Sequence, residues 1–157
     1  MALKKEFGMH KKFIIKDFIL ITLITSVWVH VYQLVRFFAY VRQELQNYLS
    51  ALPDIAPMDN LGTLLIWGLW DTLLTALYVL LFWLCAQAFG NNRKSILISG
   101  FMSWCFFFVL YWVGTANMNL IGWAPLLVIL PLTLLEPLVA SYIASKLYLR
   151  KNVYREA

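Results

Sequence analysis

The chain has few charged side chains for its length. Of its 157 residues only 13% are Asp, Glu, Lys or Arg, whereas 62% are hydrophobic and 17% are aromatic. Soluble globular domains carry about 25% charged residues, and their surfaces depend on them. This scarcity, together with a mean hydropathy of +0.72, excludes a soluble domain and indicates a protein whose solvent is the lipid bilayer.

Residues that build metal, redox and cofactor sites are also scarce. The two cysteines, Cys85 and Cys105, lie in apolar segments without CxxC spacing, which favours packing over redox chemistry. The two histidines, His10 and His30, have no zinc-binding or bis-histidine haem spacing. Phosphate-binding glycine loops and nucleophile–base arrangements are missing as well. We therefore expect no cofactor and no metal, and we assign no catalytic residue.

The positive charges that are present follow the ends of the apolar segments. The net charge is +5, but Lys and Arg do not gather on one amphipathic surface, so no nucleic-acid partner is expected. They occur in three regions that are separated by two apolar segments each and therefore lie on the same side of the membrane. These regions contain Lys4, Lys5, Lys11, Lys12 and Lys16, then Arg93 and Lys94, then Lys146, Arg150, Lys151 and Arg155. By the positive-inside rule both termini are cytoplasmic. Short loops and basic ends suit a bacterial inner membrane.

Four apolar segments are each long enough to cross the hydrocarbon core, which takes roughly 18 residues or more. They predict helices over residues 13–37, 61–89, 94–113 and 120–148, in one integral membrane domain covering 1–157. The expected fold is all-α, a polytopic four-helix bundle with both termini inside. In the outer loop 38–60, an amphipathic helical extension is predicted from the stripe Val41, Leu45, Tyr48 and Leu49.

The third and fourth helices differ in their small residues and prolines. Ser95, Ser99 and Ser103 recur every four residues, which favours a packing seam against another helix. The fourth helix contains interior prolines, and each one lacks the N–H that would bond the carbonyl four residues earlier. Pro131 and Pro137 therefore predict kinks and free carbonyls at Leu127 and Thr133.

Two carboxylates inside apolar segments are the strongest functional signal. A charge at membrane depth costs about 2.5 to 3.5 kcal/mol on insertion scales, so Asp71 and Glu136 mark an interior site. Polar side chains on three helices share faces with them: Thr22, Thr25, Ser26, His30, Gln33 and Arg36 on the first helix, Asp71, Thr75 and Tyr78 on the second, and Thr133, Glu136 and Ala140 on the fourth. A bundle can turn all three faces inward.

Depth along each helix predicts which of these groups meet. At a rise of about 1.5 Å per residue, His30 lies about 9 Å from Arg36, Asp71 about 15 Å from Leu61, and Glu136 about 24 Å from Leu120. Asp71 is accordingly predicted to pair with His30 or Arg36. Glu136 is predicted to lie near the midplane, with no basic residue at its depth.

These residues support two functional hypotheses from different classes. In the first, a site of Asp71, Glu136, His30, Arg36, Tyr78 and Thr133 serves proton- or cation-linked transport of a small substrate. In the second, the same residues only fix helix packing in a non-catalytic membrane subunit or scaffold that binds a partner protein or lipid. A lipid-modifying enzyme is the least favoured, because no reaction is specified. The expected partners are the bilayer, a second copy of the chain or another membrane protein.

Overall fold

A computed structural model describes residues 14–42 and 61–153 of the chain, and the elements there are helices without strands. The elements are α1 (Ile15–Arg36), the π-helical turn η1 (Phe37–Val41), α3 (Leu61–Phe89), α4 (Arg93–Trp104), a second π-helical turn η2 (Cys105–Val109), α5 (Leu110–Asn117) and α6 (Leu126–Val153). The all-α prediction is confirmed for this part of the chain. Most of the predicted amphipathic extension lies outside the described residues.

Four helical stretches are long and apolar enough to cross a membrane: Ile15–Tyr40, Leu61–Phe89, Arg93–Asn117 and Leu126–Leu149. The third is built from α4, η2 and α5 in succession and extends beyond the predicted end at 113. The fourth begins later than predicted. Pro125 lies just before it, and its carbonyl accepts bonds from the N–H groups of Val128 and Ile129 as the helix starts. The result is compatible with an integral membrane protein.

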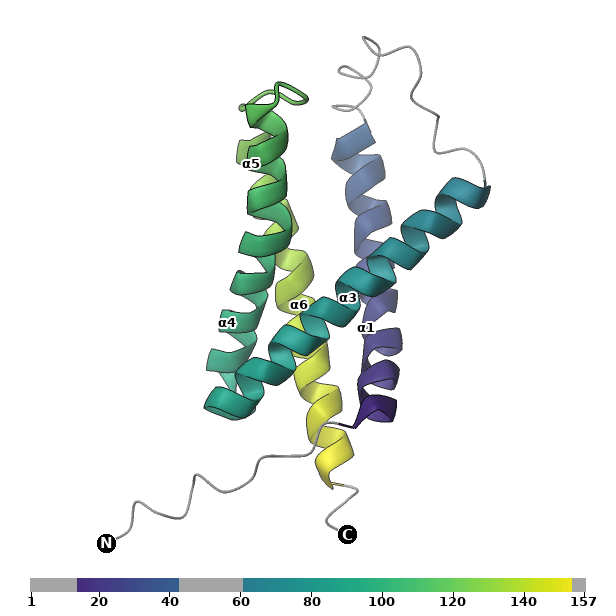
Figure 1. Ribbon diagram of the computed structural model, residues 1–157, viewed down its shortest axis with the longest axis vertical. Coiled ribbons are helices and arrows are strands. Elements are labelled where there is room, and N and C mark those ends of the chain that lie inside the picture. Colours follow the sequence, from purple (N-terminus) through teal and green to yellow (C-terminus); the bar gives the residue numbers. More distant parts are fainter. Residues whose placement is uncertain (1–13, 43–60, 154–157) are drawn as a thin grey trace, which may run out of the picture.

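The helices alternate in direction and form a bundle around α6 (Figure 1). α6 packs against α1, α3, α4 and α5, and α3 also packs against α1 and α4. The start of α1, the α3–α4 turn and the end of α6 lie at one end, which we call the turn end (Figure 1). α3 crosses the bundle obliquely, so that its Leu61 end lies far from α5 (Figure 1).

The α3–α4 turn is fixed by local and tertiary hydrogen bonds. Gly90 adopts a positive φ of 78°, which only glycine adopts without steric cost, and Asn92 caps α4 by accepting from Ser95 N–H at 3.1 Å. Asn91 is bound to α6 through two bonds: its Nδ2 donates to Ser145 O at 3.1 Å, and Ser145 Oγ donates to its Oδ1 at 2.6 Å. The turn therefore holds α3 and α4 against α6 at this end.

The contact between α4 and α6 is lined by small residues. Ser95, Ser99 and Ser103 are all fully buried, and Ser99 Oγ donates to Ser141 Oγ at 3.1 Å. Gly100 faces Leu138 so closely that a Cβ added to it would lie 3.0 Å from the Leu138 Cα. The packing seam predicted from the serine spacing is confirmed, because only small side chains allow backbones this close.

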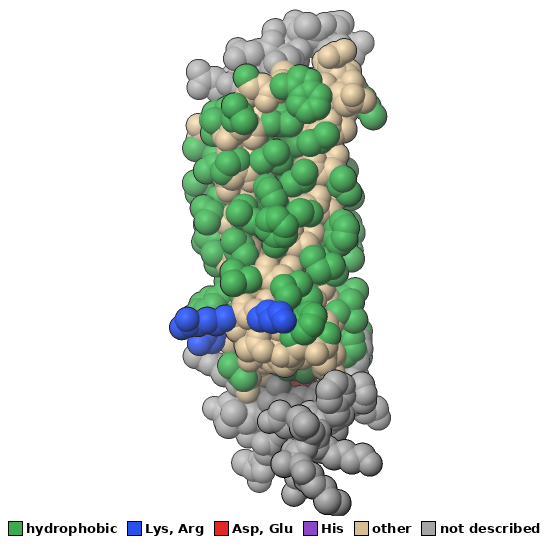
Figure 2. Space-filling model, turned by 90° about the vertical axis from the view of Figure 1, so that its left-hand side faces the viewer, with side chains coloured by type: hydrophobic (Ala, Val, Ile, Leu, Met, Phe, Trp, Pro, Cys, Tyr) green, Lys and Arg blue, Asp and Glu red, His purple; other side chains and the backbone are tan. Residues whose placement is uncertain are grey.

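Large apolar side chains cover the surface of the bundle. Leu61, Leu65, Ile66, Leu69 and Trp70 of α3 are all more than half exposed. Figure 2 shows hydrophobic side chains covering the α4 and α5 side over most of its height, with Lys and Arg side chains near the end at which α4 begins. A soluble monomer rarely exposes so continuous an apolar surface, whereas lipid acyl chains would cover it.

Candidate functional site

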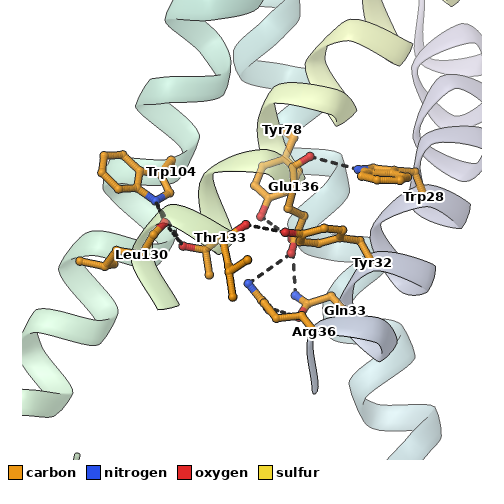
Figure 3. Close-up of polar contacts among 10 residues, drawn as sticks. Trp28, Tyr32, Gln33, Arg36, Tyr78, Trp104, Leu130, Thr133 and Glu136 are labelled. Atoms are coloured by element: carbon orange, nitrogen blue, oxygen red, sulfur yellow. Dashed lines mark hydrogen bonds and ion pairs between the residues drawn. The ribbon is translucent and has the colours of Figure 1, made fainter. Parts of the chain in front are cut away.

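Glu136 lies at the centre of a polar network that joins three helices (Figure 3). Its side chain, in the middle of α6, is fully buried. The Oε1 atom accepts from Tyr78 Oη of α3 at 3.0 Å and from Gln33 Nε2 of α1 at 3.4 Å. The Oε2 atom lies 3.5 Å from Nη1 of Arg36. One carboxylate thus connects α1, α3 and α6.

Arg36, the last residue of α1, supplies the positive charge of this network. Its side chain is only 9% exposed. Nη2 donates to Gln33 Oε1, and the guanidinium lies over the Phe108 ring of η2, 5.2 Å from the centroid. Phe107, next to Phe108 in the same π-helical turn, packs against Tyr78. Both π-helical turns therefore adjoin the site, since η1 begins immediately after Arg36.

The ion pair leaves two polar atoms without a hydrogen bond. Arg36 Nη1 and Glu136 Oε2 are both buried, and neither has a hydrogen-bond partner among the described residues. At 3.5 Å the two atoms attract each other as charges but do not form a close bond. Most buried polar atoms in proteins are bonded, so these two are available to a further donor or acceptor.

Three aromatic donors bond the backbone of α6 around this network. Trp28 Nε1 donates to Glu136 O at 3.3 Å, and Tyr32 Oη, one turn along α1, donates to Leu132 O at 2.6 Å. From α4, Trp104 Nε1 donates to Leu130 O at 2.8 Å. The sequence predicted free carbonyls at Leu127 and Thr133, but these donors reach other carbonyls of the same proline-containing helix.

Thr133 belongs to a neighbouring contact between α4 and α6. Its Oγ1 accepts from Trp104 Nε1 at 3.2 Å and donates to Leu130 O at 2.9 Å. The side chain is fully buried. Thr133 therefore orients the Trp104 indole, and its hydroxyl is not bonded to the Glu136 carboxylate.

His30 joins α1 to α3 at a separate point. Its Nδ1 lies 2.6 Å from Ser26 O of its own helix, and its Nε2 lies 3.0 Å from Gly68 O of α3. Both ring nitrogens thus face backbone carbonyl oxygens. The histidine predicted as a site residue is placed against α3, one turn before Asp71.

Asp71 is buried without the partner that the sequence predicted. The residue is 8% exposed, and its backbone carbonyl accepts from Thr75 Oγ1 at 2.7 Å. Its carboxylate forms no ion pair with a described residue, because Arg36 pairs with Glu136 instead. The sequence predicted that Asp71 pairs with His30 or Arg36, whereas in the structure Arg36 pairs with Glu136.

The expectation that Glu136 has no basic neighbour was wrong because of where α6 begins. The depth estimate counted from Leu120, whereas the helix begins at Leu126. Glu136 is then ten residues into α6, about 15 Å, which equals the depth of Asp71 in α3. The long Arg36 side chain reaches this level from the end of α1.

Sequence reasoning missed the residues that complete the network. Gln33 was placed on the polar face of α1 but was not chosen as a site residue, and Trp28, Tyr32 and Trp104 were not assigned to the site. The spacing of Trp28, Tyr32 and Arg36 by four residues was the available signal, because it puts three donors on one helix face.

The comparisons with known proteins add no family to this picture. The chain matches no protein-family model, no curated protein and no solved structure. Among residues 14–42 and 61–153, no group of three His, Cys, Asp or Glu side chains is arranged to hold a metal ion. Four side chains of α1, α3 and α6 carry the acidic and basic groups within the bundle, and we call them the charged set: His30, Arg36, Asp71 and Glu136.

Proposed function

We propose that the protein is an integral membrane protein in which the charged set binds a proton or a monovalent cation and couples its movement to that of a small substrate. The observation that carries this proposal is the unneutralised carboxylate of Asp71. Arg36 forms the ion pair with Glu136, which leaves Asp71 buried without an ion pair among the described residues. Unpaired charges at membrane depth are costly and mark proton or ion pathways.

The charge count sets the class of ligand. With a neutral imidazole, Arg36 contributes one positive charge, and Asp71 and Glu136 contribute two negative charges. The set then lacks one positive charge, and a single proton or monovalent cation would make it neutral. Divalent cations fit less well, because the described carboxylates do not form a cluster of oxygen ligands.

Arg36 gives the set a means of exchange. Its Nη1 atom lies 3.5 Å from Glu136 Oε2 and has no hydrogen-bond partner among the described residues. A proton or cation bound at Glu136 would release the guanidinium toward Asp71, and loss of that ion would return it. A guanidinium that can pair with either carboxylate would provide two alternative arrangements, as coupled transport needs.

Transport can be tested in vesicles that contain a pH-sensitive dye. Purified protein is reconstituted, gradients of H⁺, Na⁺ or K⁺ are imposed, and flux is compared among wild type, Asp71→Asn, Glu136→Gln and the matched control Asp17→Asn. Asp17, in the first turn of α1, is the remaining acidic residue of the described ranges. We expect wild type and Asp17→Asn to carry gradient-dependent flux and Asp71→Asn to fall to the level of empty vesicles. Equal flux in wild type and empty vesicles under every gradient would refute the proposal.

A second candidate function is supported by the complete burial of Glu136. In this alternative, a carboxylate that is bonded to α1 and α3 and shielded from solvent has no role in transport and serves to fix helix packing, as in a non-catalytic membrane subunit. In that case the protein would act as a scaffold for another copy of the chain or for a partner membrane protein. This function predicts no flux in any vesicle, with Glu136→Gln changing stability alone.

We further propose that the turn end faces the cytoplasm of a bacterial cell. The exposed basic side chains of Lys16, Arg93, Lys94 and Lys146 belong to this end, whereas Arg42 belongs to the opposite end. This distribution supports cytoplasmic termini under the positive-inside rule. A reporter fused after the last residue, active only in the cytoplasm, should be active, and an inactive reporter in a stable fusion would reverse the orientation.

A further inference from the structure

The environment of His30 bears on where the charged set holds its proton. We infer that His30 is a proton-binding site and that its imidazole carries N–H groups on both ring nitrogens. The inference deepens the proposed function, since it names the group that supplies the missing positive charge.

The two contacts of the ring require two donors. A neutral imidazole has one N–H, and its second nitrogen is an acceptor with a lone pair. Backbone carbonyl oxygens are acceptors only, and His30 faces two of them, at 2.6 Å from Nδ1 and 3.0 Å from Nε2. In the neutral form one nitrogen lone pair would point at a carbonyl oxygen at hydrogen-bonding distance. Both contacts are favourable only in the doubly protonated ring.

The neighbouring charges favour the same form. The charged and titratable groups from the helices packed here are Tyr32 and Arg36 of α1, Asp71 and Tyr78 of α3, and Glu136 of α6. Arg36 is paired with Glu136, so Asp71 is the carboxylate left to balance a positive ring. A protonated His30 makes the charged set neutral, with two positive and two negative groups. Within lipid, charged residues persist mainly when they are balanced in this way.

The position of His30 gives this proton a structural effect. Its Nε2 contact with Gly68 O joins α1 to α3 one turn before Asp71. Loss of a ring proton turns one of the two contacts into repulsion between lone pairs. Proton release at His30 would thus weaken the α1–α3 contact beside the carboxylate that balances it.

Nitrogen NMR of the full chain in lipid nanodiscs tests this inference. The chain has two histidines, so a His10→Gln background leaves His30 as the only labelled imidazole. At neutral pH we expect both ring nitrogens to show bonded protons and the closely spaced shifts of an imidazolium. Two widely separated shifts, with one protonated nitrogen, would overturn the assignment.

Two carboxamide variants test the role of Asp71 in the same spectrum. We expect Asp71→Asn to lose most of the doubly protonated signal, because the balancing charge is gone, and Asp17→Asn to keep it. An unchanged signal in Asp71→Asn would overturn Asp71 as the counter-charge. If Asp71→Asn fails to fold, the His10→Gln spectrum, in which Asp71 is intact, still decides whether His30 is doubly protonated. The spectrum and the flux assay test the two proposals separately. If His30 is an imidazolium but no flux is found, only the proposed transport is refuted. If flux is found but the ring is neutral, only the inference about His30 is refuted.

Discussion

The guanidinium of Arg36 lies 3.5 Å from the carboxylate of Glu136 and joins the end of α1 to the middle of α6. Both side chains are buried, so each would be an uncompensated charge without the other. The pair therefore governs both the packing of the bundle and the charge left over for Asp71.

Removing one partner of this pair should destabilise the bundle more than removing both. We expect Glu136→Met or Arg36→Met alone to lower the free energy of unfolding by about 3 to 5 kcal/mol, because a buried charge loses its partner. The double variant should recover most of that loss. Reversible unfolding in mixed micelles measures all three, and strictly additive losses would show that the two charges do not interact.

The Tyr78 hydroxyl should contribute through its bond to the Glu136 carboxylate. Tyr78→Phe removes the donor at 3.0 Å and leaves the ring in place, which should cost about 1.5 to 3 kcal/mol for a bond to a charged acceptor. Tyr111→Phe is the matched control, since Tyr111 is 63% exposed. Equal stability of the two variants in the same unfolding assay would mean that the Tyr78 bond adds nothing to the fold.

Two helix glycines should respond oppositely to alanine. At Gly100 a new Cβ would lie 2.7 Å from Leu138 Cδ2 and 3.0 Å from its Cα, and overpacking of this kind costs about 1 to 3 kcal/mol. At Gly114 a new Cβ meets nothing within 4 Å, so alanine should add up to about 1 kcal/mol through its higher helix propensity. Unfolding temperatures of the two variants give the comparison. A stabilising Gly100→Ala would show that α4 and α6 are not closely packed there.

The bonds between Asn91 and Ser145 should act as a unit. Ser145→Ala and Asn91→Ala each remove the bond between their side chains, at about 0.5 to 1.5 kcal/mol for a neutral hydrogen bond. Because they share that bond, the double variant should lose less than the sum of the singles. A double-mutant cycle in the micelle assay measures the coupling. Zero coupling would place the α3–α4 turn away from α6.

Sequence patterns predicted the helices well because lipid imposes a simple rule on length and polarity. A span such as Leu61–Phe89 is defined by its apolar run and by the turn residues that follow it, and the predicted range is the one found. The start of α6 was missed by six residues. The segment from Leu120 to Pro125 is apolar enough for a span, but the helix begins only after Pro125.

The candidate site was predicted by residue type but not by pairing. Asp71 and Glu136 stood out because each is a carboxylate in an apolar run, which needs no knowledge of the fold. Their partners depend on side-chain reach and on the crossing of α1, α3 and α6. Arg36 was predicted only as one of two alternative partners of Asp71, whereas it pairs with Glu136. Gln33 was left out although it bonds to both Arg36 and Glu136.

The bonds from Asn91 to Ser145 fix the α3–α4 turn to α6, while the other end of α3 crosses away from α5 (Figure 1). Along the helix, Gly68 is about 33 Å from Gly90 and Tyr78 is about 18 Å from it. A rigid rotation of α3 about the turn would therefore displace Gly68 nearly twice as far as Tyr78. In such a rotation the His30–Gly68 contact would lengthen before the Tyr78–Glu136 bond, because it lies farther from the turn.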